Sequence, residues 1–391
     1  MPAFIFHGRI AHAGGQVLNF YFSKFYHDDT FELGFAFRVK TKDSDYEKMR
    51  AEYSEAKDLS ISYNILTLYL YSFLSKCVRL IFGNTKMIIS SLDYRNAIIR
   101  ISKKARRSWY PDVIVMDWTQ TNIWAGLVRA ILPNSKIIAV EHDVSFMGIN
   151  RLFPLDEHVR TSFLKNEIAG LRCADTVLVF NEKDRQLLLP YLDNDKIRII
   201  TPFYRRYKTN QEDFEERNGI LFFGAMQRSE NIEAVRFFLE RIWPLLNCKQ
   251  DVVFYCVGGG VDKNLIRQYV TNNVVFTGFV DDPSDYFQEA FCFVVPLLHG
   301  AGIKIKVIEG MASGIPVITN DIGIEGIPAK RARDYIHCDT IEDYVEAIDN
   351  LFFHRERCAA YAENAKAFIE STFPLEQSYG DYRSIVLNLV E

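Results

Sequence analysis

Short apolar runs that alternate with helical periods most restrict how this chain can fold. From residue 110 onward, helical segments separate four runs typical of buried strands: PDVIVMDW, SKIIAVEHD, DTVLVFN and DKIRIITPF. Such alternation predicts βαβ units and a parallel sheet. After the polar segment 205–218 the pattern restarts with GILFFGAM, DVVFYCVGGG, NVVFTGFV, FCFVVPLL and IPVITND. We therefore expect an α/β fold of two doubly wound, Rossmann-like domains.

The chain length supports this division, because 391 residues exceed what one ordinary core accommodates. We predict an amino-terminal domain over 1–204, a linker at 205–218 and a second domain over 219–372. Segment 373–391 is predicted as a helix with an apolar face. Two such domains in tandem would face a cleft, and ligands of open α/β sheets bind beyond the carboxyl ends of the strands.

Composition narrows the class of protein. The formal net charge of −4 gives no support for nucleic-acid binding, so we expect no nucleic-acid partner. The seven cysteines are scattered without a CxxC pair, which predicts neither a zinc site nor a disulfide framework. The amino terminus, MPAFIFHGRI, lacks a basic region followed by a long apolar run. We expect a cytoplasmic enzyme or binding protein.

One apolar segment in the first half leaves two interpretations open. Segment 65–82 is the longest apolar stretch, but Lys76 and Arg79 interrupt it, and a spanning helix needs about 20 mostly apolar residues. A basic cluster follows at 103–107. A basic amphipathic patch can hold a protein on anionic lipid, which would give peripheral contact with the inner face of a membrane. The alternative is a core helix followed by a solvated loop.

The stretch HGAGIKIKVIE has features that suit a phosphate or diphosphate. Its first residues, 299–302, follow a predicted strand and precede a predicted helix, whose first amides have no internal acceptor. Gly300 and Gly302 let an anion approach the backbone, while Lys304 and Lys306 add positive charge. The spacing matches neither GxxxxGK[ST] nor GxGxxG. We therefore predict an anion site at residues 299–306 that is neither a P-loop nor a GxGxxG dinucleotide-binding turn.

Glu309 follows Gly302 by roughly two helical turns. An ionised carboxylate accepts hydrogen bonds, so Glu309 could hold the two vicinal hydroxyls of a ribose attached to that phosphate. The alternative is a solvated glutamate loosely paired with Lys306. We favour the ligand role because of the neighbouring glycines and lysines.

Other polar residues also follow predicted strands. His142 could donate to a sugar hydroxyl or act as an acid or base near neutral pH, and Asp143 is equally placed. Asp117 could serve the site or cap the following helix. Glu325 could face a cleft or lie in a turn, and 258–260 could serve close packing or the approach of a nucleotide. No DxD pattern indicates a metal site.

The motifs together resemble those of GT-B glycosyltransferases, more narrowly of retaining bacterial enzymes of glycosyltransferase family 4. The resemblance covers most of 219–352 and looser matches in 1–204. It rests on GAGIKIKVIEGMASGIPVITNDIGIEG, FFGAMQRSENIEAVRFFLERIWPLL and VVFTGFVDDPSDYFQEAFCFVVPL, with GG at 14–15, EHD at 141–143 and CADTVLVFNEKDRQLL. It implies a GT-B fold, in which 373–391 packs back on the first domain.

The resemblance also implies roles for single residues. Glu309 matches the glutamate that binds the donor ribose, and Gly302 and Ile303 would offer amides to the diphosphate. Positive charge would come from Arg228 and from Lys304 or Lys306. His142 matches a histidine near the transferred sugar. His299 occupies the neighbourhood of a glutamate that contacts the sugar in the family, which is a departure from the pattern.

The function implied is metal-independent, retaining transfer of a hexose-like sugar from a nucleotide-diphosphate sugar to a saccharide or lipid-linked acceptor, in bacterial surface polysaccharide or glycan assembly. No cofactor is expected. Two alternatives remain: a GT-B nucleotide-sugar epimerase, which would turn over the donor without an acceptor, and a non-catalytic sugar-nucleotide-binding subunit, which would bind without transfer.

Overall fold

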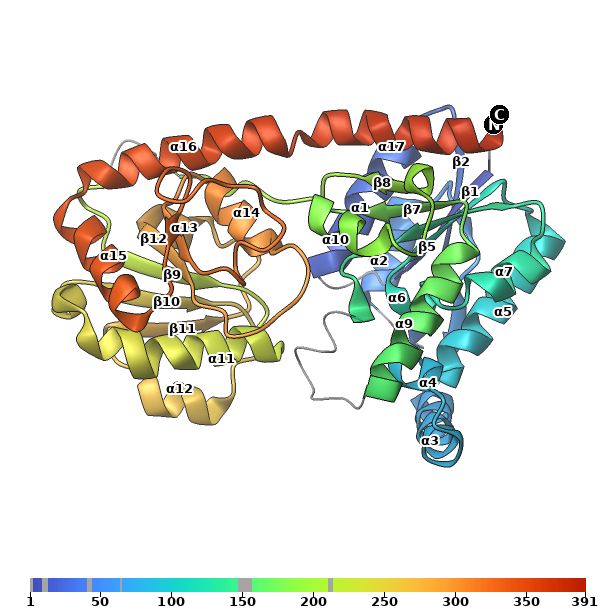
Figure 1. Cartoon of the computed structure of the whole chain (residues 1–391), viewed down its shortest axis with the longest axis horizontal. Helices are drawn as coiled ribbons and strands as arrows, with labels where there is room; N and C mark the ends of the chain where they lie inside the picture. The colour runs from blue at the N-terminus through green and yellow to red at the C-terminus, as the bar shows by residue number, and fades with distance from the viewer. Residues whose placement is uncertain (1–2, 9–12, 41–43, 64, 147–156, 210–213) are drawn as a thin grey trace. The chain divides into compact units, whose positions relative to one another are not determined.

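Two compact units make up the chain in the computed structural model, which describes residues 3–8, 13–40, 44–63, 65–146, 157–209 and 214–391 (Figure 1). Unit 1 comprises Met1–Phe203 and Leu375–Glu391, and unit 2 comprises Tyr204–Pro374. Each unit has its own parallel sheet, as the alternating pattern predicts. Among the helices that the structure describes, none combines the length and the apolar character of a membrane-spanning segment.

Unit 1 is built on a parallel sheet with the order β3-β2-β1-β5-β6-β7-β8, and β4 pairs with β2. The order reverses between β1 and β5, which lie side by side with Ile5 opposite Ile114. The β5 residues are all buried, as expected for a strand covered on both faces. The strands are β1 (Ala3–Gly8), β2 (Glu32–Lys40), β3 (Lys57–Asp58), β4 (Ile61–Tyr63), β5 (Val113–Asp117), β6 (Lys136–Val140), β7 (Thr176–Val179) and β8 (Ile197–Ile199).

The last helix of the chain, α17 (Leu375–Val390), packs on α1 (Ala13–Tyr26) within unit 1. Tyr21 Oη lies 2.7 Å from Ser378 Oγ, and the Tyr382 ring is 2% exposed. The other helices of unit 1 are α2 (Ser44–Glu52), α3 (Ile65–Phe82), α4 (Lys86–Ile89), α5 (Leu92–Ser108), α6 (Thr119–Asn122), α7 (Ala125–Ile131), α9 (Glu157–Arg172), α10 (Glu182–Leu188) and η1 (Asn194–Lys196).

Unit 2 has a second parallel sheet, ordered β11-β10-β9-β12-β13-β14. Its order reverses between β9 and β12, so their carboxyl ends form the switch point at which ligands of such sheets bind. The strands are β9 (Gly219–Phe223), β10 (Val253–Val257), β11 (Val274–Gly278), β12 (Ala290–Val295), β13 (Val317–Thr319) and β14 (Ile336–His337).

Helices flank this second sheet. α11 (Ser229–Phe237) continues into a π-helical turn, η2 (Phe238–Ile242), and β12 is followed by α14 (Ile305–Ala312). The remaining helices are η3 (Trp243–Leu245), η4 (Asn247–Gln250), α12 (Lys263–Tyr269), α13 (Ser284–Glu289), α15 (Ile341–Phe353) and α16 (Glu356–Thr372).

The predicted linker 205–218 packs on unit 2 instead of standing free. The Tyr207 ring lies 4.4 Å from the Phe287 ring, and the Tyr207 amide donates to Ser313 Oγ at 2.9 Å. Phe214 and Arg217 are also buried. Segment 210–213 lies outside the described residues. The sequence did not show this packing, because the segment is mostly polar and only a few of its side chains are aromatic.

Candidate functional site

The switch point of unit 2 gathers two loops that follow neighbouring strands. β9 leads through Gly224 into α11, and β12 leads through residues 296–304 into α14. No side chain caps the first turn of α14, where Gly302, Ile303 and Lys304 present the backbone. The amides at this end have no acceptor inside the helix. The predicted anion-binding backbone therefore lies at the switch point.

Glycines are required at this point by conformation and by space. Gly300 and Gly302 have φ of 144° and 68°, which side-chain-bearing residues rarely adopt. A Cβ on Gly224 would lie 2.9 Å from Asn231 Nδ2 and 3.4 Å from Lys306 Nζ. A Cβ on Gly258 would lie 1.9 Å from the Gly224 carbonyl oxygen, so Gly258 serves close packing of two backbone turns.

Lys306 is a partly buried cation of this site. Its Nζ donates to Asn231 Oδ1 and lies 5.0 Å from the centroid of the Phe222 ring. Burial lowers the pKa of Lys306 to about 7, and the nearby charge of Arg228 acts in the same direction. An anion bound beside Lys306 would stabilise its charged form.

Glu309 is 5% exposed, so its interpretation as a solvated glutamate is wrong. Its Oε1 accepts a hydrogen bond from the Arg205 amide at 3.2 Å. Burial raises the pKa of Glu309 to about 7, against the lowering effects of Arg205 and Lys306. A buried carboxylate with a single amide donor retains lone pairs that ligand hydroxyls can use.

Lys304 and Glu325 stabilise the 299–302 loop, and their polar groups contact the protein itself. Lys304 Nζ donates to the carbonyl oxygens of Gly302 at 2.5 Å and Ala301 at 3.2 Å, and lies 3.5 Å from Glu325 Oε2. The side chains of Lys304 and Glu325 are 8% and 7% exposed. Of the two lysines proposed for the diphosphate, Lys306 is therefore the better placed.

Two glutamates of α11 contact residues that we predicted for the site. The sequence did not indicate either glutamate. Glu233 Oε2 lies 3.0 Å from His299 Nε2, so a carboxylate reaches the 299–302 loop from another helix. Glu230 pairs at 2.5 Å with Arg228, which precedes α11 and keeps its side chain 57% exposed. Only folding brings Glu233 and His299 together, since 66 positions separate them in the chain.

In unit 1 a second polar group lies at the carboxyl ends of β5 and β6. His142 Nε2 lies 2.8 Å from Asp117 Oδ1, so Asp117 does not cap the following helix. The Trp118 ring stacks on His142 with centroids 4.0 Å apart, and Phe180 meets His142 edge-on. Trp118 has a φ of 75°, a strained conformation for a bulky residue. His142 is thus fixed on several sides.

Glu141, which precedes His142 in the chain, and Glu167 are both buried. Glu141 accepts from Thr119 Oγ1 at 2.5 Å and from Asn122 Nδ2 at 3.0 Å. Glu167 accepts from the amides of Ser145 and Phe146, each at 2.9 Å, and so holds the segment that follows Asp143. Burial raises the pKa of Glu141 to about 8 and that of Glu167 above its usual range, and the charge of Asp143 raises both further.

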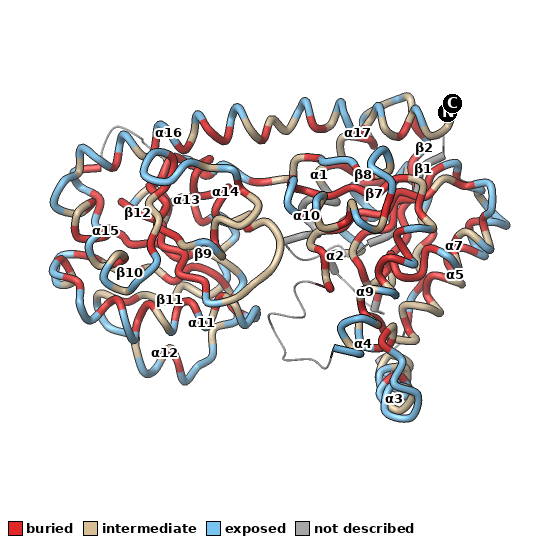
Figure 2. Tube along the Cα trace, viewed as in Figure 1, coloured by how far each residue is buried: buried red, intermediate tan, exposed pale blue. Residues whose placement is uncertain are grey.

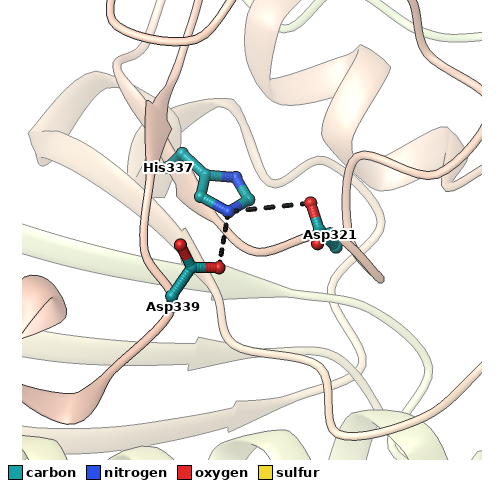
Figure 3. Close-up of side chains that lie close together, drawn as sticks. All are labelled: Asp321, His337 and Asp339. Atoms are coloured by element: carbon teal, nitrogen blue, oxygen red, sulfur yellow. Dashed lines mark hydrogen bonds and ion pairs between the residues drawn. The ribbon is translucent and has the colours of Figure 1, made fainter.

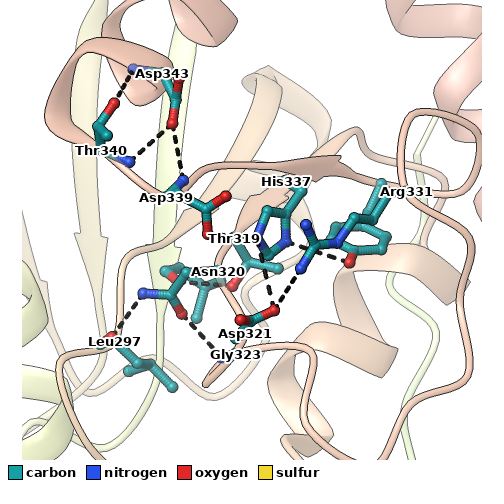
Figure 4. A network of polar contacts seen from close by, with 12 residues as sticks. Leu297, Thr319, Asn320, Asp321, Gly323, Arg331, His337, Asp339, Thr340 and Asp343 are labelled. Carbon is teal, nitrogen blue, oxygen red and sulfur yellow. Dashed lines mark hydrogen bonds and ion pairs between the residues drawn. The ribbon is translucent and has the colours of Figure 1, made fainter.

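One further cluster has metal-ligand residue types. Asp321, His337 and Asp339 each offer a ligand atom within 4.8 Å of the others, and Figure 3 shows His337 between the two carboxylates. Arg331 Nη2 donates to Asp321 Oδ1 at 2.7 Å, as Figure 4 shows. Because the guanidinium already compensates Asp321, we interpret the cluster as an ion-pair network.

The same network connects the loop after β12 with the turn after β13 (Figure 4). Asn320 Nδ2 donates to the Leu297 carbonyl oxygen at 2.7 Å, and the Gly323 amide donates to Asn320 Oδ1 at 3.0 Å. Asn320 therefore helps to fix the strand end from which the 299–302 loop begins.

Comparisons with known proteins show that the second unit is similar to glycosyltransferases. Residues 217–353 match the family model described as "Glycosyl transferases group 1". The chain is 23% identical over 171 residues to the lipopolysaccharide core biosynthesis mannosyltransferase LpsB of Rhizobium meliloti (strain 1021), a match that covers 40% of this chain and 48% of that protein. The matches span about half the length of the curated relatives.

Solved structures extend the likeness to the whole chain. Anabaena Alr3699/HepE in complex with UDP superposes with a TM-score of 0.71 at 13% identity, covering 99% of this chain and 100% of that one. Sucrose-phosphate synthase of Thermosynechococcus elongatus gives 0.72 at 14% identity, covering 100% and 99%. These comparisons confirm the predicted resemblance to GT-B glycosyltransferases: the chain has the GT-B fold, and its second unit carries the glycosyl transferases group 1 pattern.

Proposed function

We propose that this protein is a glycosyltransferase that moves a hexose-like sugar from a nucleotide-diphosphate sugar to a saccharide or lipid-linked acceptor. The observation that carries the proposal is the switch point of unit 2, where the uncapped start of α14, Lys306 and buried Glu309 lie together. Amides and a cation suit the diphosphate, and an acceptor carboxylate suits the ribose.

Loss of the sugar develops negative charge on the departing diphosphate. Preorganised amides and cations aimed at that oxygen stabilise the transition state, and removal of one such donor costs about 10²–10³ in rate. We assign this role to the amides of Gly302 and Ile303 and to the charges of Lys306 and Arg228. This account requires no metal ion. Gly300 supplies the turn that opens the loop.

Unit 1 would bind the acceptor, and His142 would donate to, or exchange a proton with, a hydroxyl of the reacting sugars. Asp143 is the neighbouring candidate. We further propose retention of anomeric configuration, as the resemblance to family 4 implies, and a cytoplasmic role in the assembly of bacterial surface polysaccharide or glycan. The similarity to a lipopolysaccharide mannosyltransferase supports this setting.

Thermal unfolding with free UDP, GDP and dTDP tests donor binding. At least one nucleotide should raise the unfolding temperature, and Glu309→Gln, which keeps the side-chain shape, should remove most of that shift. Exposed Glu346 on α15 provides a matched control, since Glu346→Gln should leave the shift unchanged. No shift with any nucleoside diphosphate, or an unaltered shift in Glu309→Gln, would count against the proposal.

A second candidate, a non-catalytic sugar-nucleotide-binding subunit, is favoured by the contact between His299 and Glu233. In this interpretation the histidine ties the loop to α11 instead of contacting a sugar. Glu233→Gln separates the candidates. In a transferase this change should raise KM for the sugar nucleotide or lower kcat while binding of the free nucleoside diphosphate persists. Absence of transfer by the unmodified chain to any glycan acceptor, with nucleotide binding intact, would favour the binding subunit.

A further inference from the structure

Helix α3 exposes an unusual amount of apolar surface. Half of the exposed large apolar side chains in the described part of the chain lie on this one helix of unit 1. Figure 2 shows α3 mostly in the colours of exposed and intermediate residues. They include Leu66, Tyr69, Phe73, Leu80, Ile81 and Phe82, of which Phe73 is 63% and Leu80 81% exposed.

The opposite face of α3 is anchored to unit 1. Leu68, Tyr71 and Val78 pack against the core, and together with Ser75 they recur at helical spacing along one stripe. Ser75 Oγ accepts from the Leu92 amide at 2.9 Å, which fixes the helix to the first turn of α5. Because α3 already packs on unit 1 through this stripe, its exposed face is not the one that contacts the core. α3 therefore has two apolar faces, one packed on unit 1 and one exposed to solvent.

The charged side chains of α3 itself have a single sign. No aspartate or glutamate occurs from Leu59 to Leu92, whereas Lys76 and Arg79 are both exposed on the helix. Long basic side chains can lay their stems on apolar surface and keep their charged ends in the headgroup layer. A surface of this kind is complementary to lipids with apolar chains and anionic headgroups.

We propose that α3 docks unit 1 on a membrane that contains anionic lipid, lying in the interface with Phe73 and Leu80 among its inserted residues. The helix has 18 residues, about 27 Å, and no described helix is suited to crossing a membrane, so it lies along the surface. A contact between two copies fits less well, because α3 carries Lys76 and Arg79 but no acidic side chain that could pair with them in a second α3.

The basic cluster at 103–107 does not belong to this surface. Lys104 Nζ donates to the carbonyl oxygens of Asp58 and Ser60, at the end of α5 remote from the Ser75–Leu92 contact. The sequence suggested that segment 65–82 and this cluster act together. We instead assign the contact with lipid to α3 alone, and the cluster becomes a matched charge control.

Co-sedimentation of the full chain with vesicles tests the proposal without reference to catalysis. The chain should pellet with vesicles of phosphatidylcholine and phosphatidylglycerol, and less with phosphatidylcholine alone. The variant Phe73→Asp/Leu80→Asp should bind at least about tenfold more weakly. Leu245→Asp/Phe353→Asp makes the same change at exposed apolar residues of unit 2 and should bind as the unmodified chain does.

Charge is tested separately. Lys76→Gln/Arg79→Gln should weaken binding to the anionic vesicles by about 5–30-fold, and added salt should reduce this difference. Lys103→Gln/Arg107→Gln should have little effect. Because all these side chains are exposed, circular dichroism and the unfolding temperature should stay unchanged.

Three results would overturn the proposal. The first is an unmodified chain that stays in the supernatant at every lipid concentration. The second is a Phe73→Asp/Leu80→Asp variant that sediments like the unmodified chain. The third is self-association that this variant abolishes while neither form binds vesicles, which would assign α3 to a contact between copies.

Discussion

His142 Nε2 lies 2.8 Å from Asp117 Oδ1, and Asp117 is 2% exposed. A carboxylate oxygen accepts, so Nε2 carries the hydrogen in this contact and Nδ1 of a neutral ring is left as an acceptor. Trp118, in its strained conformation, covers one face of the ring. Asp117 is therefore a positioning residue that fixes the ring orientation and tautomer of His142.

The first prediction concerns this pair. If His142 exchanges a proton with a reacting hydroxyl, His142→Ala should lower kcat by about 10²–10⁴. Asp117→Asn should lower kcat by a smaller factor and shift the pH profile, with little change in KM for the sugar nucleotide, because an amide can hold the other tautomer. Steady-state kinetics across pH would measure both. An Asp117→Asn variant with the parental pH profile would assign Asp117 to stability alone.

The second prediction concerns Glu141, whose pKa burial raises to about 8. Between its ordinary pKa and about 8 the folded chain binds a proton that the unfolded chain has released, so the free energy of unfolding falls as pH rises through this window. Glu141→Gln removes this dependence and can keep the contacts to Thr119 and Asn122. The variant should gain stability relative to the unmodified chain as pH rises from 5 to 9, by on the order of a few kcal/mol.

Chemical unfolding at several pH values would measure this difference. Glu157→Gln, at an exposed residue of α9, should follow the unmodified chain throughout. A constant difference between Glu141→Gln and the unmodified chain over the range would mean that Glu141 does not take up a proton on folding.

The third prediction follows from burial of Lys306, which lowers its pKa to about 7. A bound diphosphate stabilises the ammonium, so above pH 7 binding of a nucleoside diphosphate should take up a proton. The dissociation constant should rise by up to about tenfold per pH unit there. Calorimetry in buffers of different ionisation enthalpy would count the protons. Lys306→Met should bind more weakly and without proton uptake, and retained uptake would exclude Lys306 as the group responsible.

Local sequence pattern was sufficient for the strands but not for the contacts between distant residues. The run PDVIVMDW contains β5, and FCFVVPLL contains all of β12 except Ala290, because buried parallel strands are almost wholly apolar. The sequence did not show that Asp117 meets His142 across 25 positions, or that Glu233 meets His299 across 66. Such pairs depend on which strands become neighbours, and short-range periodicity carries no such information.

The solvent exposure of individual side chains was the property that could least be predicted from the sequence. The apolar run at 65–82 is compatible with a core helix or an interfacial helix, and only the folded chain shows which side chains remain uncovered. Conversely, Glu309 could have been a solvated residue by its chemistry, yet the packing of Arg205 and Tyr207 encloses that part of α14.

The last prediction compares two glycines in different surroundings. A Cβ on Gly258 would lie 1.9 Å from the Gly224 carbonyl oxygen, and its φ of 138° disfavours alanine. Gly258→Ala should therefore destabilise unit 2 and weaken nucleotide binding through displacement of the Gly224 turn.

Gly380 lies within α17, and an added methyl group there would have no neighbouring atom within 4 Å, so Gly380→Ala should stabilise unit 1 by about 0.5–1 kcal/mol. Calorimetric unfolding with and without a nucleoside diphosphate would measure both, and a Gly258→Ala variant that binds and unfolds like the unmodified chain would refute the tight contact between the two turns.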